Sequence, residues 1–296
     1  MNSKKADIKT GFLCNNNCIF CVQGHKKKFG DKDTPKLKRI IKEAKDGCDA
    51  ITFTGGEPTI RKDILELVRF AKKLGFKTIQ IQSNGRMFAY EKFCQDMIKA
   101  GANEFALAVH GHNEKLHNYL TQAESFKQVI SGIHNLKKLK QRVILNTVIC
   151  RSNYRQLPEI AKLLVSLDVD QFQFAFVHAL GAAEENFDSV VPRVSLVIPH
   201  LKRAIDIGWL MKKAVMVEGI PACFLPGYEN HISENFMPDM KIFDLDNTIE
   251  DFKESRLAEG KLKGKKCRTC KNFPGCEGMW REYPLKFGWD EFLPIK

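Results

Sequence analysis

The stretch Cys14-Asn-Asn-Asn-Cys18-Ile-Phe-Cys21 places three cysteines on one short loop, directly after a predicted strand over Ile8–Leu13. A loop this compact can bring three thiolates to three corners of an iron–sulfur cubane. Electron-transfer [4Fe-4S] clusters are held by four cysteines, and no fourth cysteine lies nearby, so one iron would stay open for a ligand. A zinc knuckle is the weaker alternative, because zinc sites usually complete C-x2-C elements with His or Cys.

Strand-like runs alternate with amphipathic helical stretches along the next 160 or so residues. After Ile8–Leu13 the predicted strands are Ala50–Thr54, Lys77–Gln82, Glu104–His110, Arg142–Ile149 and Gln171–Val177. Parallel strands joined by helical crossovers form right-handed units, so this α/β pattern predicts a partial (β/α)6 barrel, with an open doubly wound sheet as the alternative. A predicted helix over Val197–Met211 closes this part. We expect a core barrel over 1–210 and a cysteine-containing extension over 211–296.

Two glycine-containing turns end successive predicted strands. Gly55, Gly56, Glu57 and Pro58 follow the second strand, and Ser83-Asn84-Gly85 follows the third. Paired glycines let the backbone approach a ligand closely, although each turn is a common one by itself. In a parallel barrel the carboxyl ends of the strands share one rim, where ligands bind.

The octapeptide CNNNCIFC resembles the CxxxCxxC signature of the radical S-adenosylmethionine (SAM) superfamily, including the aromatic Phe20 before the third cysteine. This resemblance implies that the open iron chelates SAM and that reductive cleavage gives a 5′-deoxyadenosyl radical. Further residues resemble the family's SAM-contacting elements: Gly55, Gly56, Glu57 and Pro58 its GGEP motif, Ser83 and Asn84 its SNG element. Arg151 is a candidate partner for the SAM carboxylate, because Arg binds carboxylates bidentately.

Histidines also follow strands on the predicted rim. His110 ends the fourth strand and His178 follows the sixth, so both are candidates for a substrate pocket, although a histidine at a strand end is also a common satisfied polar residue. Asn146 and Thr147 belong to the fifth strand. Alternation cannot decide which of the two faces the pocket if that strand is buried on both sides.

A second group of cysteines lies in the predicted extension. Cys267, Cys270 and Cys276 form C-x2-C-x5-C, and Cys223 lies upstream. The spacing resembles the SPASM and Twitch extensions of the same superfamily, and the absence of later cysteines favours the single-cluster Twitch type, which implies a second, auxiliary [4Fe-4S] cluster. Zinc is the alternative metal. Cys223 would complete the cluster, leave an iron open for substrate if it does not, or donate a hydrogen atom as a thiol.

Composition bounds the remaining expectations. The 296 residues are 44% hydrophobic and 28% charged, as in ordinary globular proteins. No run approaches the roughly 18 apolar residues of a membrane span, so we expect a cytoplasmic protein without a membrane partner. Ten cysteines in that compartment indicate metal chemistry rather than disulfides. The aromatic tail from Trp280 to Phe292 is expected to pack against the barrel, with a substrate channel as the alternative.

The leading functional hypothesis is a maturase that abstracts hydrogen from a peptide or protein. Its partners would be that substrate and a reductase or ferredoxin/flavodoxin-type electron donor. A cofactor-biosynthesis enzyme acting on a nucleotide-like substrate is the alternative within the class. From another class, a metal-cluster protein that binds RNA would use the net charge of +12, but the glycine turns have no role in it, so a nucleic-acid partner is not expected.

Overall fold

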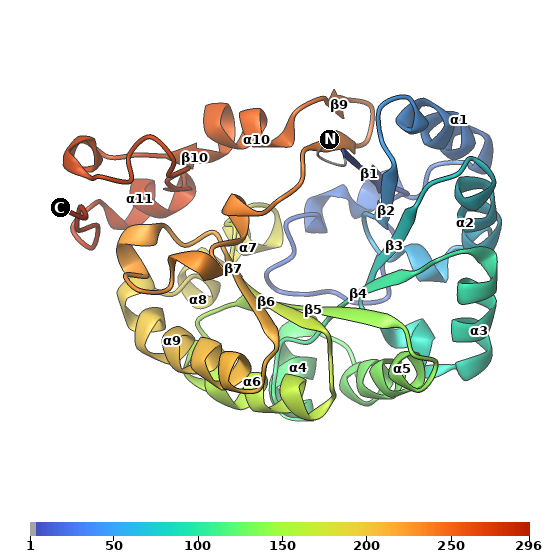
Figure 1. Ribbon diagram of the computed structural model, residues 1–296, viewed down its shortest axis with the longest axis horizontal. Coiled ribbons are helices and arrows are strands. Elements are labelled where there is room, and N and C mark those ends of the chain that lie inside the picture. The colour runs from blue at the N-terminus through green and yellow to red at the C-terminus, as the bar shows by residue number, and fades with distance from the viewer. Residues whose placement is uncertain (1–3) are drawn as a thin grey trace.

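The computed structural model describes residues 4–296, so the first three residues of the predicted core barrel lie outside the described part. Its main feature is a curved sheet with the linear strand order β7-β6-β5-β4-β3-β2-β1-β8-β9, which does not close into a complete barrel (Figure 1). All neighbours pair in parallel except β8 and β9. The strands are β1 Lys5–Lys9, β2 Ala50–Thr54, β3 Thr78–Ser83, β4 Glu104–Ala108, β5 Arg142–Ile149, β6 Gln171–Phe176, β7 Ala214–Glu218, β8 Met240–Phe243 and β9 Thr248–Ile249.

The predicted parallel α/β architecture is confirmed, with three further strands and one shifted strand. Strand β7 extends the sheet beyond the six predicted strands on one side, and β8 and β9 extend it on the other. The predicted strand over Ile8–Leu13 is wrong after Lys9, because β1 runs from Lys5 to Lys9 and includes only its first two residues. Gly11 then forms an isolated bridge with Asp31, and a Cβ at Gly11 would meet Asp31 Oδ1 at 2.1 Å. This close crossing turns the chain out of the sheet before the cysteine loop.

Most of the helices cover the convex side of the sheet, whereas α7 (Ala182–Glu185) lies against the cysteine loop, where the Ala182 N–H donates to Cys21 O (Figure 1). In this part of the chain the helices are α1 Thr34–Lys45, α2 Ile64–Lys73, α3 Glu91–Ala100, α4 Glu114–Thr121, α5 Phe126–Lys138, α6 Leu157–Ser166, α7 Ala182–Glu185, α8 Phe187–Val190 and α9 Val194–Leu210. Helix α1 illustrates the local signals: the Asp33 side chain caps the Lys36 N–H, Pro35 lies in the first turn, and Leu37 and Ile41 recur at helical spacing on the buried face.

The last part of the chain is less regular. It contains α10 Phe252–Ser255, the strand pair β10 Lys261–Leu262 and β11 Met279–Trp280, and α11 Glu282–Phe287. Short 3-10 or π turns complete the chain: η1 Gly24–Phe29, η2 Pro58–Ile60, η3 Arg86–Ala89, η4 Tyr154–Gln156, η5 Ala222–Phe224, η6 Glu229–His231, η7 Ser233–Asn235, η8 Arg256–Gly260 and η9 Lys265–Thr269. The aromatic tail packs on the barrel as expected, since the buried Tyr283 hydroxyl accepts the Val194 N–H at the start of α9.

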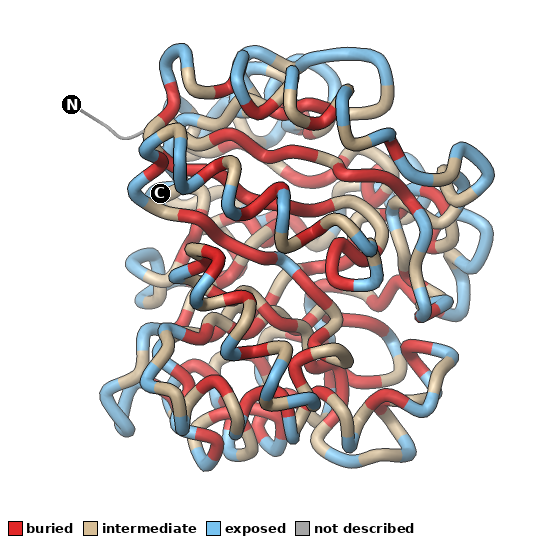
Figure 2. The backbone as a smooth tube through the Cα atoms, turned by 90° about the vertical axis from the view of Figure 1, so that its right-hand side faces the viewer, coloured by how far each residue is buried: buried red, intermediate tan, exposed pale blue. Residues whose placement is uncertain are grey.

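The two faces of the sheet differ in chemistry. Buried apolar residues of alternate positions face the helices; Phe172 and Val215, for example, lie against Gly208 of α9. Polar side chains occupy the other positions and bond across the concave face, as Gln80 does with Lys5 and Glu104. Figure 2 shows the buried strands inside and the exposed residues mostly on the outer turns and helices. The barrel interior is therefore built to hold polar groups.

Candidate active site

A cavity of about 390 Å³ opens at the carboxyl ends of the strands. Its lining includes Cys14, Cys18, Cys21 and Phe20 of the cysteine loop. It also includes Gly55, Gly56 and Glu57 after β2, Ser83 and Asn84 at the end of β3, and His110 and His178 after β4 and β6. The structure thus brings together most of the residues that the sequence singled out at separate strand ends.

The cysteine loop is fixed from several sides. The Gly56 N–H donates to Gly11 O and the Glu57 N–H to Leu13 O, both at 2.8 Å. A Cβ at Gly56 would meet Leu13 O at 2.2 Å, so only glycine lets the β2 turn approach this closely. Lys27 Nζ donates to Asn16 O at 2.7 Å from the other side of the loop. The three thiols are therefore presented by a held backbone.

The three thiols suit a metal cluster. All are free and partly buried, and they share one cavity. Burial raises the pKa of Cys14, Cys18 and Cys21, and the neighbouring Cys21 and Cys14 raise that of Cys18 further. Thiolates crowded in this way are unfavourable unless positive charge compensates them, as the irons of a cluster would. The donor set therefore fits the [4Fe-4S] cluster that the sequence predicts.

Glu57 joins the β2 and β3 ends. Its carboxylate accepts hydrogen bonds from the Thr59 N–H and hydroxyl, from Ser83 Oγ at 2.8 Å and from the Asn84 N–H at 2.6 Å. Burial raises the pKa of Glu57, and these hydrogen bonds partly oppose the shift. Pro58, in contrast, is buried behind this turn as the first residue of η2 and does not line the cavity. Glu57 therefore holds the two ligand-facing turns in register.

His110 is a buried, neutral residue at the cavity wall. Its Nδ1 accepts the Val148 N–H at 3.2 Å, and its ring meets the edge of Phe20 at 4.6 Å between centroids. Burial lowers the pKa of His110 to about 3, so the ring stays uncharged at neutral pH. The contact with the His110 ring holds Phe20 within the cysteine loop.

His178 lies at the other side of the cavity. Its ring stacks on Trp280 with 4.0 Å between centroids and 9° between planes. Its Nε2 is 3.2 Å from Glu282 Oε2, which is an ion-pair distance, but neither atom has a partner in hydrogen-bond geometry among residues 4–296. His178 therefore reaches the cavity with an unsatisfied ring nitrogen.

Several buried polar atoms at the cavity lack hydrogen-bond partners in the described part of the chain. They are Gln23 Oε1, Asn146 Oδ1 and Trp280 Nε1, besides His178 Nε2. Buried polar groups in folded proteins are normally paired, so a group of unpaired ones around one cavity is typical of a ligand-binding site. Alternation thus directs Asn146 inward, whereas Thr147 bonds Val109 O on the opposite face.

The structure does not bring Arg151 to this cavity. Its side chain is exposed and donates from Nη2 to Val191 O at 3.2 Å, after the end of β5. Pairing of Arg151 with the SAM carboxylate therefore stays a prediction without geometric support.

Sequence reasoning missed Glu218 and undervalued Trp280. Glu218 is the last residue of β7, and Trp280 belongs to β11, yet both line the cavity. The apolar alternation of Ala214–Val217 could have marked β7, with Glu218 at its carboxyl end. Nothing local marks Trp280, because its place depends on how the last part of the chain folds back.

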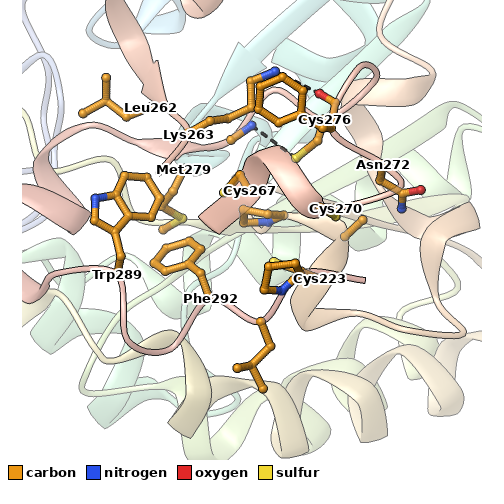
Figure 3. A pocket seen from close by; sticks show the side chains of 16 residues that line it. Cys223, Leu262, Lys263, Cys267, Cys270, Asn272, Cys276, Met279, Trp289 and Phe292 are labelled. Carbon is orange, nitrogen blue, oxygen red and sulfur yellow. Dashed lines mark hydrogen bonds between the residues drawn. The ribbon is translucent and has the colours of Figure 1, made fainter. Parts of the chain in front are cut away.

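The four C-terminal cysteines surround a second, smaller cavity (Figure 3). Cys223 lies on η5, Cys267 on η9, and Cys270 and Cys276 on the turns that follow. Burial and the other three thiols raise the pKa of Cys223 to about 12. Among residues 4–296 no group of three or more His, Cys, Asp or Glu side chains is arranged to hold a metal ion. Four cysteine thiols around one cavity are a donor set for a [4Fe-4S] cluster or for a tetrahedral zinc ion, the two metals expected from the sequence.

Comparison of sequences places this site among known proteins. Residues 8–164, just over half of the chain, match the Radical SAM superfamily. The chain is similar to the probable GTP 3′,8-cyclase of Sulfurisphaera tokodaii, with 25% identity over 179 residues. That match covers 60% of this chain and 56% of the relative, so the chain spans little more than half of the relative's length.

Solved structures share the fold over almost the whole chain. Streptococcus suis SuiB bound to S-adenosylmethionine has a TM-score of 0.70 at 15% identity, over 96% of this chain and 74% of SuiB. Native anSMEcpe with bound AdoMet and Cp18Cys peptide has a TM-score of 0.68 at 18% identity, over 99% of this chain and 93% of its own. The likeness at these identities concerns the fold, and it includes the segment with the C-terminal cysteines.

Proposed function

Because the chain belongs to the radical SAM superfamily, we propose that it is an enzyme that abstracts a hydrogen atom from a peptide or protein substrate. The family implies a [4Fe-4S] cluster and SAM, which together supply a 5′-deoxyadenosyl radical when bound. The observation that carries the proposal is the single cavity that joins three free cysteines, the glycine turn and unpaired buried polar atoms.

Each part of the cavity then has a task. Cys14, Cys18 and Cys21 would hold the cluster. Gly55 and Gly56 let the β2 turn lie against the cysteine loop and expose backbone to a ligand. Glu57 fixes that turn relative to Ser83 and Asn84 through its hydrogen bonds.

Two observations favour a peptide substrate over a nucleoside triphosphate. The whole chain shares its fold with enzymes whose solved structures carry peptides, including anSMEcpe. Lys9 is the one Lys or Arg that lines the cavity in the described chain, and Asp7 pairs with it at 3.0 Å. A triphosphate normally needs several unpaired cations, whereas a peptide does not.

A nucleotide-like substrate is the second candidate, because a sequence relative is named a GTP 3′,8-cyclase. GTP added to the reduced, SAM-loaded enzyme distinguishes the two. Under the peptide proposal GTP is recovered unchanged by mass spectrometry, and conversion of GTP would replace that proposal by the second candidate.

We further propose an auxiliary [4Fe-4S] cluster held by Cys223, Cys267, Cys270 and Cys276 in an accessory segment that begins near residue 210. The four thiols around one cavity support it. A cytoplasmic flavodoxin, ferredoxin or reductase would supply electrons. Among residues 4–296 no helix is long and apolar enough to span a bilayer.

The first experiment is anaerobic reconstitution with iron and sulfide, followed by dithionite, SAM and an assay for 5′-deoxyadenosine. Wild type should form it, and a variant with Cys14, Cys18 and Cys21 all changed to Ala should not. Cys48→Ala is the matched control, because Cys48 is buried away from both cavities. Iron-loaded wild type that neither binds SAM nor forms 5′-deoxyadenosine would overturn the proposal.

A further inference from the structure

A cluster of buried charges lies beneath the β7 side of the cavity. Lys261 Nζ is 2.7 Å from Glu234 Oε1 and 3.0 Å from Glu277 Oε2. Arg256 binds the same Glu277 through two nitrogens, at 2.7 and 2.9 Å. Lys261, Arg256 and Glu277 are buried and Glu234 is partly buried, and within this group two cations balance two carboxylates. The group is therefore electrically complete by itself.

Glu218 is a third carboxyl beside this balanced group. Gln173 Nε2 donates to its Oε2 at 2.5 Å, and its other oxygen has no hydrogen-bond partner among residues 4–296. The surface that Glu218 keeps is turned to the cavity that it lines. Burial and the nearby Glu234 raise the pKa of Glu218 to about 7, while Lys261, Arg256 and the Gln173 hydrogen bond oppose the shift without cancelling it.

The neighbourhood of Glu218 offers a further acceptor. Asn146 Oδ1 is buried without a partner among residues 4–296 and lies on β5 in register with Gln173, the residue that bonds Glu218. Trp280 lines the same cavity, with its ring stacked on His178 and the Lys261 ammonium 4.8 Å from its centroid. Ala175, which pairs in register with Glu218, is small and leaves space above the sheet. Such a set of acceptors suits a ligand group that carries N–H donors and positive charge.

We propose that this end of the cavity is a substrate subsite for a primary ammonium or guanidinium group, such as the side chain of a basic residue in a peptide. The subsite rests on the proposed function and names the substrate class more closely. A ligand cation pairs with the open oxygen of Glu218, and Asn146 Oδ1 is a further acceptor for its N–H donors on the wall of the same cavity. An anionic ligand would meet an uncompensated carboxylate there.

The test measures binding of two short peptides to reconstituted, SAM-loaded holoenzyme by anaerobic calorimetry. The probes are acetyl-Gly-Lys-Gly-amide and its norleucine analogue, which differ in the charged amine. Wild type should bind the lysine peptide about tenfold more tightly, the effect of one charge-assisted hydrogen bond. In Glu218→Gln the preference should fall to about one. Glu229→Gln, which removes an exposed carboxylate outside this cavity, should keep it.

Several outcomes would contradict the subsite. Equal binding of the two peptides by wild type, no binding of either, or a preference that survives in Glu218→Gln each overturns it. If Glu218→Gln fails to load iron, Asn146→Ala replaces it and should weaken the lysine peptide about threefold while sparing the norleucine peptide. The 5′-deoxyadenosine assay on the same wild-type sample separates the two claims. Absence of 5′-deoxyadenosine contradicts the proposed function. Formation of 5′-deoxyadenosine without a preference for the lysine peptide contradicts only the subsite.

Discussion

Glu57 shows how one side chain can secure two turns of the site. Its carboxylate accepts four hydrogen bonds from Thr59, Ser83 and Asn84 while it is fully buried. An amide at this position turns one acceptor into a donor that faces other donors. Glu57→Gln should therefore lower the free energy of unfolding by about 1–3 kcal/mol.

Thermal unfolding of anaerobically loaded protein measures this change. The control is Glu66→Gln, which removes only an exposed carboxylate paired with Lys38 and should cost less than about 1 kcal/mol. Equal unfolding temperatures for the two variants would show that the Glu57 hydrogen bonds do not hold the turns.

Glu218 gives a pH dependence of stability. Its pKa of about 7 in the folded protein exceeds its ordinary value of 4.5, so folding favours the protonated form. The stability that this preference contributes is complete below about pH 4.5 and is lost as pH rises through 7. Glu218→Gln should therefore be more stable than wild type at pH 8, by at most about 3 kcal/mol, and the gap should close toward pH 5. Thermal unfolding at both pH values measures it, with exposed Glu185→Gln as control; a gap independent of pH would contradict the assignment.

At the residue scale, the sequence identified the cavity residues that belong to a known motif and missed Glu218, which belongs to none. Cys14, Cys18 and Cys21 are marked by their spacing, and the cavity joins them as expected. Glu218 belongs to no motif: the alternation of Ala214–Val217 could mark the strand that it ends, but its role depends on Gln173 of the neighbouring strand β6. Arg151 lies after β5 as expected, but its side chain donates to Val191 O, so its pairing with the SAM carboxylate stays a prediction.

At the element scale, the contact between the β2 turn and the cysteine loop leaves no space for a side chain. Gly56→Ala would place Cβ at 2.2 Å from Leu13 O and 2.6 Å from the Phe12 carbonyl carbon, both backbone atoms. We expect the loop to shift and the iron content at this site to fall by about four per chain. Iron analysis after reconstitution measures this, and unchanged iron content would show that the loop can move aside.

Gly260→Ala is the matched control for Gly56→Ala. Its Cβ would meet Trp280 at 3.5 Å, an ordinary van der Waals contact, so iron loading should not change. Both variants replace glycine by alanine, and they differ in the space available for the added Cβ atom.

The hydrophobic periodicity predicted the six central strands of the sheet, but not where β1 ends or which strands lie at the sheet's edges. The six strands from β1 to β6 follow from apolar alternation and helix punctuation. The sequence could not show that Gly11 crosses Asp31 and ends β1 early, nor that β8 pairs with β1, because both depend on segments distant in sequence.

At the scale of the whole molecule, two cysteine groups in two cavities predict two independent iron loads. Wild type should bind about eight irons, and either the Cys14/Cys18/Cys21→Ala variant or a Cys267/Cys270/Cys276→Ala variant about four. Iron and sulfide analysis with Mössbauer spectroscopy measures this. Four irons in wild type, or zinc in the second site, would contradict the auxiliary cluster.

The sequence predicted the second cysteine group but not its relation to the first cavity. Trp280 follows Cys276 closely in sequence and reaches the main cavity through β11, so the C-terminal segment is part of the wall and not an appendage. Such a relation comes from tertiary packing and has no local pattern.

The pairing of β8 with β1 has a consequence for synthesis of the chain. Strand β1 carries the cysteine loop immediately behind it, and residues 240–243, about four-fifths of the way along, cover its outer edge. A ribosome makes the thiols first and their flanking strand very late, so the nascent chain exposes an unpaired strand edge next to three reactive thiols. If iron arrives before residue 243 leaves the ribosome, the strand that carries the cysteine loop is paired with β2 but not yet with β8. Cluster insertion is thus expected to follow translation.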